Sequence, residues 1–192
     1  MNLADVYLET QRRLVTLAPT LTEEQLATVT EGCPDWTVRD VLGHLVGLAG
    51  EVAAGNYEGV GRPDRTAAQV ADHAGHSVRE LCRVWERYAP GVKRRIEEMG
   101  RRLTPPVVDI WTHEQDLANP IGIASGRRGA GLPITLNAAW AMKRKLRVTE
   151  VPALRLITEV VDWIIGDSDP AATLRASSYE VARAVIGRRR LD

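Results

Sequence analysis

The sequence has no phenylalanine and only two cysteines among its 192 residues. Two cysteines, Cys33 and Cys82, are too few for a disulfide scaffold or for a zinc cluster built from cysteines, and they are typical of a reducing compartment. The first residues include acidic side chains where a secretory signal needs a basic start, and no stretch approaches the ~20 apolar residues of a membrane span. We therefore expect a cytoplasmic protein that neither spans a membrane nor is exported.

An excess of either charge is also missing, because Lys and Arg total 25, Asp and Glu total 25, and the formal net charge is zero. A protein that binds nucleic acid through its phosphates normally carries a basic surplus, so nucleic acid is excluded as the main partner. The two glycine-containing loops, 55–61 and 122–131, hold neither G-x-x-x-x-G-K-S/T nor G-x-G-x-x-G. No nucleotide is implied.

Most of the chain has the apolar spacing of amphipathic helices. A capping box at 22–25 predicts a short element, and Thr37 with Asp40 predicts the start of a longer helix. Pro90 is expected to kink or break the longest helix. The predicted helices cover residues 3–18, 37–54, 66–99, 104–119 and 134–148. The sequence therefore predicts a mainly α fold with a helical bundle over residues 1–150.

From Pro152 onward the pattern changes to short runs rich in β-branched residues. These runs predict three short antiparallel strands, at 154–161, 163–165 and 172–175, with a turn at 166–170. A closing helix is expected over 179–186, stopped by Gly187. Residues 151–192 are therefore predicted to form a small C-terminal α/β appendage.

The chain has four histidines, which differ in where they lie on their predicted helices. His76 points away from the apolar stripe of its helix and His73 lies at the edge of that stripe, so both are most simply solvated, although the pair can hold a metal loosely. His44 falls on the border of the buried stripe near Leu48. A border position faces a cleft between helices.

His113 shares one side of its helix with Asp109, four residues earlier, and Asp116, three residues later. In the functional interpretation, Asp109 and His113 clamp a divalent metal with His44 from a second helix, which leaves a position for water or substrate as in catalytic zinc sites. Asp116 then orients an imidazole. In the alternative interpretation, Asp109 and His113 form only a helical ion pair, and His44 is a core histidine bonded to a carbonyl.

Two further groups have less specific patterns. Cys33 precedes a proline in a loop beside Trp36, which favours a small buried apolar group over a nucleophile. The basic runs are most simply solvated helix ends, at 93–95, 101–102 and 188–190. One of these arginines can still bind an anionic substrate with its bidentate fork.

The segment CPDWTVRDVLGHL, residues 33–45, resembles a helix motif of the mycothiol-dependent maleylpyruvate isomerase-like family, within the DinB-like metal-binding bundles. The segment DIWTHEQDL, residues 109–117, looks like the other metal-ligand helix of that family, and residues 169–189 resemble the small C-terminal domain of many actinobacterial members. The resemblance implies a four-helix up-down-down-up bundle with metal ligands at His44, Asp109 and His113. Better-characterised members have Glu where this chain has Asp109.

The resemblance also implies a function. An open position on the metal, zinc or nickel, would activate a low-molecular-weight thiol such as mycothiol for addition to a small electrophilic substrate, followed by isomerisation or thiol transfer. His44, Asp109 and His113 would be ligands, Asp116 the orienting group, and Arg188 a clamp for a substrate carboxylate. The alternative is a non-catalytic metal-binding or regulatory module on the same fold. A homodimer is compatible with the sequence.

Overall fold

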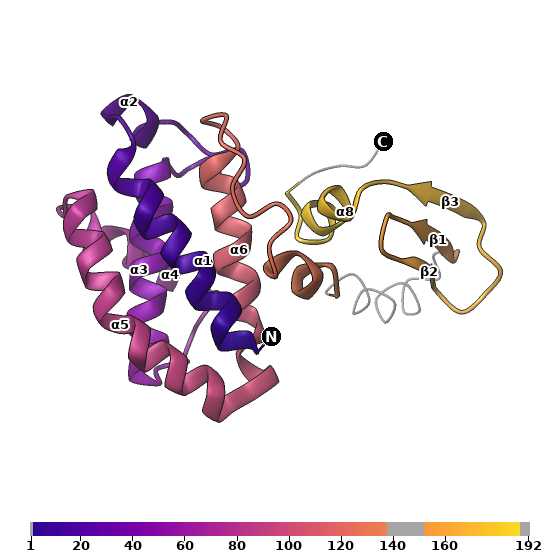
Figure 1. Ribbon diagram of the computed structural model, residues 1–192, viewed down its shortest axis with the longest axis horizontal. Coiled ribbons are helices and arrows are strands. Elements are labelled where there is room, and N and C mark those ends of the chain that lie inside the picture. Colours follow the sequence, from indigo (N-terminus) through magenta and orange to yellow (C-terminus); the bar gives the residue numbers. More distant parts are fainter. Residues whose placement is uncertain (1, 138–151, 189–192) are drawn as a thin grey trace. The chain divides into compact units, whose positions relative to one another are not determined.

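The computed structural model describes residues 2–137 and 152–188 (Figure 1). The contacts within the chain divide it into two compact units, Met1–Gly126 and Arg127–Asp192. The domain boundary predicted at 150/151 falls among residues 138–151, which lie outside the described range, and it stays a prediction. Among the described residues, no helix is long and apolar enough to cross a membrane. The mainly α class with a small C-terminal strand and helix part is confirmed.

The N-terminal unit is a bundle of four long helices with one shorter helix on its flank (Figure 1). Helix α1 packs on α5 and α6, and α3 packs on α4, α5 and α6. Fully buried Trp85 and Trp111 lie in its core with Leu14, Leu42 and Leu45. The elements are α1 (Leu3–Leu17), η1 (Ala18–Thr20), α2 (Glu23–Leu26), α3 (Val38–Ala54), α4 (Pro63–His73), α5 (Val78–Met99), η2 (Gly100–Leu103) and α6 (Thr104–Ala118).

The helix predicted over 66–99 is two helices, and the break lies earlier than expected. Pro90 is predicted to kink or break the helix, but it stands inside a continuous α5, so the break at that proline is wrong and the kink stays a prediction. Helix α5 begins instead with a capping box, in which the Ser77 hydroxyl accepts from the backbone N–H of Glu80 and the Glu80 carboxylate accepts from the N–H of Ser77. This box satisfies backbone donors at a new helix start, which favours the break before Val78.

Two glycines of α3 allow α4 to approach closely. A Cβ at Gly47 would lie 2.8 Å from the Cβ of Gln69, and one at Gly43 would lie 3.3 Å from the Cβ of His73. Since real Cβ atoms almost never come as close as the first of these distances, any larger residue at position 47 would displace α4. The glycines therefore determine that Gln69 reaches the buried face of α3.

The C-terminal unit contains a three-stranded sheet and a closing helix. Its strands β1 (Leu154–Ile157), β2 (Asp162–Ile165) and β3 (Ala172–Arg175) lie in the order β2-β1-β3, and α8 (Ser178–Val185) follows them. Residues 131–137 are helical, and the rest of the helix predicted over 134–148 lies outside the described residues. Leu136, Leu156, Ile165 and Val181 form the core of this unit.

The prediction of three antiparallel strands is wrong for β3. Strand β1 pairs with β2 antiparallel, as expected, but with β3 parallel, with Leu156 opposite Leu174. The physical reason is the edge that β3 occupies. Strand β3 runs opposite to β2 but passes to the free edge of β1, where it has the same direction as β1.

Candidate metal centre

His44 is held at its Nδ1 by a chain of hydrogen bonds that runs from α3 to α4. His44 is 5% exposed, and its Nδ1 lies 2.7 Å from the amide oxygen of Gln69. The Gln69 amide nitrogen donates to Glu51 at 2.6 Å, and Arg65 donates to the other oxygen of Glu51 at 2.9 Å. Because the amide oxygen of Gln69 can only accept, Nδ1 must carry a proton. In the neutral ring the lone pair is therefore on Nε2, which lies 3.3 Å from Asp109 Oδ2.

His113 lies on α6 between two carboxylates. Its Nε2 is 3.6 Å from Asp109 Oδ1, and its Nδ1 is 3.2 Å from Oδ2 of the buried Asp116. The distance to Asp116 is short, but the angle of this contact is unsuitable for a hydrogen bond. The Nδ1 atom is therefore buried without a hydrogen-bond partner. The rings of His113 and His44 meet edge to face, with centroids 4.9 Å apart. The predicted residues His44, Asp109, His113 and Asp116 thus lie together.

The donor atoms of His44, Asp109 and His113 lie close enough together to hold one metal ion. Each residue offers an atom within 4.8 Å of the others, with His44 Nε2 3.3 Å from Asp109 Oδ2 and His113 Nε2 3.6 Å from Asp109 Oδ1. Metal–ligand bonds of about 2.0–2.2 Å place the ligands of a tetrahedral site about 3.3–3.6 Å apart. Two imidazoles and one carboxylate fit a divalent metal and leave a position for another ligand.

The charges around His44 favour a cation. Burial opposes protonation of the ring, but the hydrogen bond and charge of Asp109, with smaller contributions from Gln69 and Glu51, outweigh it, so the pKa of His44 is raised above its ordinary value. Without a metal, a proton on Nε2 is thus stabilised where a metal would bind. The same carboxylate attracts either cation.

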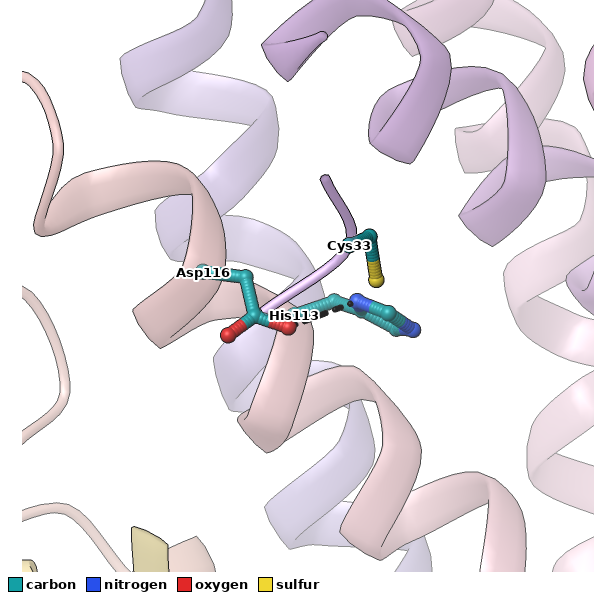
Figure 2. Close-up of side chains that lie close together, drawn as sticks. All are labelled: Cys33, His113 and Asp116. Carbon is teal, nitrogen blue, oxygen red and sulfur yellow. Dashed lines mark ion pairs between the residues drawn. The ribbon is translucent and has the colours of Figure 1, made fainter. Parts of the chain in front are cut away.

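The loop between α2 and α3 brings two further side chains to the cluster. Backbone hydrogen bonds join Thr30 N to Trp36 O at 3.0 Å and Val38 N to Thr28 O at 2.9 Å, which close the loop against the start of α3. The Trp36 ring centroid lies 5.3 Å from that of His44. The loop also positions Cys33, whose sulfur lies with the donor atoms of His113 and Asp116 (Figure 2).

Cys33 is only partly buried, so the expectation of a small buried apolar group is wrong for it. Gln69 and the contact of Trp36 with the histidines were not predicted from the sequence. Cys33 and Trp36 stand in the motif that carried the family resemblance, which is a signal for their proximity to His44. Gln69 has no such signal, because its position depends on how α4 packs.

The other predicted residues lie elsewhere. His76 is exposed, as expected, whereas His73 is half-buried and its Nδ1 bonds the backbone oxygen of Gln69 at 2.8 Å. The two rings contact each other, with centroids 5.6 Å apart. Arg188 belongs to the C-terminal unit, where its backbone N–H donates to Arg183 O, and its role toward a substrate stays a prediction.

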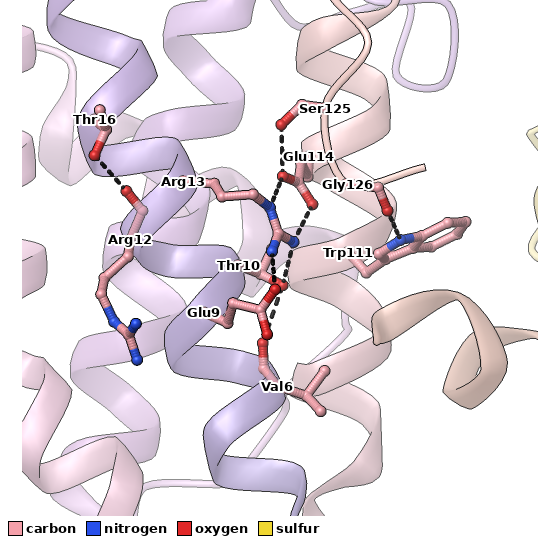
Figure 3. Close-up of polar contacts among 10 residues, drawn as sticks. All are labelled: Val6, Glu9, Thr10, Arg12, Arg13, Thr16, Trp111, Glu114, Ser125 and Gly126. Atoms are coloured by element: carbon pink, nitrogen blue, oxygen red, sulfur yellow. Dashed lines mark hydrogen bonds and ion pairs between the residues drawn. The ribbon is translucent and has the colours of Figure 1, made fainter. Parts of the chain in front are cut away.

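A partly buried ion pair fixes α6 from another face (Figure 3). Glu114 is fully buried, and it accepts from Arg13 of α1 through both oxygens, at 2.7 and 2.9 Å. Ser125 donates to the same carboxylate at 2.7 Å, and Trp111 donates to the carbonyl of Gly126 at 3.1 Å. These bonds join α1, α6 and the segment that follows α6. They fix the orientation of α6 about its own axis, and therefore the direction in which Asp109 and His113 point.

The model of the mycothiol maleylpyruvate isomerase N-terminal domain family matches residues 7–118, more than half of the chain and all three candidate ligands. The chain belongs to this family. Two crystal structures of the mycothiol-dependent maleylpyruvate isomerase, one of them a histidine-to-alanine mutant, share its fold with TM-scores of 0.66 and 0.62. Both are 14% identical to it, and each match covers 97% of this chain and 87% of the other. No curated protein matches the sequence.

Proposed function

We propose that the protein is a metal-dependent enzyme that uses a low-molecular-weight thiol, mycothiol or a close analogue, to isomerise a small electrophilic molecule or to transfer the thiol to it. The observation that carries the proposal is the arrangement of His44, Asp109 and His113. Their donor atoms lie within 4.8 Å of one another, and Gln69 directs the Nε2 lone pair of His44 toward the other two. Zinc suits this set of ligands, and nickel is the second choice.

Each residue of the cluster has a stated role in this proposal. His44, Asp109 and His113 would hold the metal, and Asp116 at the second nitrogen of His113 would orient that ring. A bound divalent metal favours the thiolate over the thiol, and thus supplies a nucleophile at neutral pH. Trp36 shields one side of the imidazoles from water. Arg188 is proposed to bind a carboxylate of the substrate, and the presence of only two cysteines suits a cytoplasmic location.

A zinc titration of metal-free protein tests the ligand assignment. All variants carry Cys33→Ser, since that thiol also lies close to His113. We expect the background variant to bind zinc stoichiometrically, and His44→Ala or His113→Ala to lower the affinity by more than ~100-fold, which exceeds the usual effect of an outer-shell residue. His73→Ala and His76→Ala are the matched controls and should leave the affinity unchanged. Loss of zinc in these controls, with retention in His44→Ala, would overturn the assignment.

A thiol-transfer screen with zinc-loaded protein tests the activity. Electrophilic substrates are offered with mycothiol, and thiol consumption and substrate isomerisation are both followed. We expect turnover that requires both the metal and the thiol and that is lost in His113→Ala. Stoichiometric zinc without thiol-dependent turnover of any electrophile would instead favour a non-catalytic metal-binding module on the same fold.

A further inference from the structure

His113 has a second set of potential ligands on the side opposite the candidate metal centre. Its Nδ1 is buried without a hydrogen bond and lies 3.2 Å from Asp116 Oδ2. The Cys33 sulfur, the imidazole and the Asp116 carboxylate each offer an atom within 4.8 Å of the other two. Figure 2 shows the Cys33 side chain directed at the imidazole from the loop, with Asp116 reaching the same ring from α6.

We infer that Cys33, Asp116 and Nδ1 of His113 form a second metal position that takes a thiophilic divalent ion. A thiolate, an imidazole and a carboxylate are all zinc-type ligands, and the sulfur selects for softer ions such as Cd²⁺. Asp116 is 1% exposed, so the position offers a negative charge in a region of low dielectric constant. Cys33 is partly exposed, which gives an ion access from solvent.

The two metal positions exclude each other through His113. A neutral imidazole has one nitrogen with a proton and one with a lone pair. An ion bound at Nε2 with His44 and Asp109 leaves the proton on Nδ1, facing Asp116. An ion bound at Nδ1 with Cys33 leaves the proton on Nε2, facing Asp109. A thiophilic ion at the second position therefore removes one ligand from the first, and the protein binds either ion but not both.

Cadmium titration of metal-free, full-length protein tests this position, because a cadmium–thiolate bond has a near-ultraviolet charge-transfer band. We expect the band in the unmodified protein, in Cys82→Ser and in His44→Ala, which keeps all three ligands of the second position. Cys33→Ser should lose the band but still bind zinc, which shows that it folds. His113→Ala should lose the band as well. Cadmium should also protect Cys33 from alkylation.

Three results would overturn the inference: no band in the unmodified protein, a band that persists in Cys33→Ser, or a band that disappears in Cys82→Ser. A further check is competition, in which cadmium added to zinc-loaded protein should release zinc as the band rises. Binding of both metals together would contradict the sharing of His113. Only this exclusion rests on the proposed metal centre. If the Cys33→Ser variant failed to bind zinc, the proposed centre would be overturned, but the cadmium–thiolate band of the unmodified protein would still support the second position.

Discussion

Gln69 is expected to control metal affinity although it does not lie among the ligands. Its amide oxygen accepts the proton of His44 Nδ1 at 2.7 Å, and this bond selects the tautomer whose Nε2 lone pair faces Asp109. Gln69→Leu keeps most of the side-chain volume and removes the acceptor. The buried Nδ1–H of His44 then has no partner, and the neutral ring no longer favours the tautomer that binds metal at Nε2.

The size of the effect can be estimated from the bond that is lost. An intramolecular hydrogen bond contributes about 0.5–1.5 kcal/mol, and a buried donor left without an acceptor costs about 1–3 kcal/mol. Loss of an outer-shell partner of a metal-bound histidine lowers affinity by about 10–100-fold, or about 1.4–2.7 kcal/mol. The two estimates overlap. The full cost applies here because Gln69 is 5% exposed, so water cannot readily take the place of its amide oxygen. We therefore expect zinc to bind Gln69→Leu about 10–100-fold more weakly.

The assay is competition for zinc with a chromophoric chelator, again in the Cys33→Ser background. The matched control is His73→Ala. His73 lies one turn later on α4, and its ring bonds the backbone oxygen of Gln69 rather than the side-chain amide. This control should bind zinc with the affinity of the background, because its ring bonds neither His44 nor the side chain of Gln69. Two results would refute the reasoning: unchanged affinity in Gln69→Leu, or an equal loss in His73→Ala, which would point to a displaced α4.

Three further predictions concern pH, backbone and thiols. The pKa of His44 is raised, so protons compete with the metal at a higher pH than for an ordinary histidine. As the pH is lowered, zinc affinity measured by titration should therefore begin to fall before the pH reaches ~6.5. Gly126→Ala should lower the free energy of unfolding, measured by urea denaturation, by about 2 kcal/mol. The φ angle of Gly126 is +57°, and a Cβ there would overlap the Glu114 carboxylate. A disulfide reagent should titrate Cys33 in the native protein but Cys82 only after unfolding, because burial raises the pKa of Cys82 to about 11.

The candidate ligands could be predicted from the sequence because their relation is local. Asp109, His113 and Asp116 share one face of α6 by helix geometry alone, whatever the helix packs against. His44 needed one more step, namely that a polar residue at the border of a buried stripe faces a neighbouring helix. The buried environment follows that geometry, with His44 and His113 at 5% and 4% exposure.

The rest of the site could not be predicted, since it depends on contacts between distant segments. Gln69 reaches His44 only because α4 packs against Gly47, and no periodicity in α4 reveals that contact. Cys33 reaches His113 only because backbone hydrogen bonds between residues 28–30 and 36–38 fold the loop back. The direction of β3 has the same cause, because a β-branched run indicates a strand but not the edge on which it pairs.

The two histidines of the candidate metal centre differ in how firmly their protons are placed. His44 stands between an amide oxygen and a carboxylate, and the amide, itself fixed by Glu51, assigns the proton to Nδ1. His113 stands between two carboxylates, with Asp109 3.6 Å from Nε2 and Asp116 3.2 Å from Nδ1, so that a negative charge faces each nitrogen and neither position is favoured for the proton. The surroundings thus fix the tautomer of His44 and leave that of His113 to the ligand that binds. Selectivity between zinc and softer ions should therefore be changed by substitutions beside His113, whereas substitutions beside His44 should change only affinity.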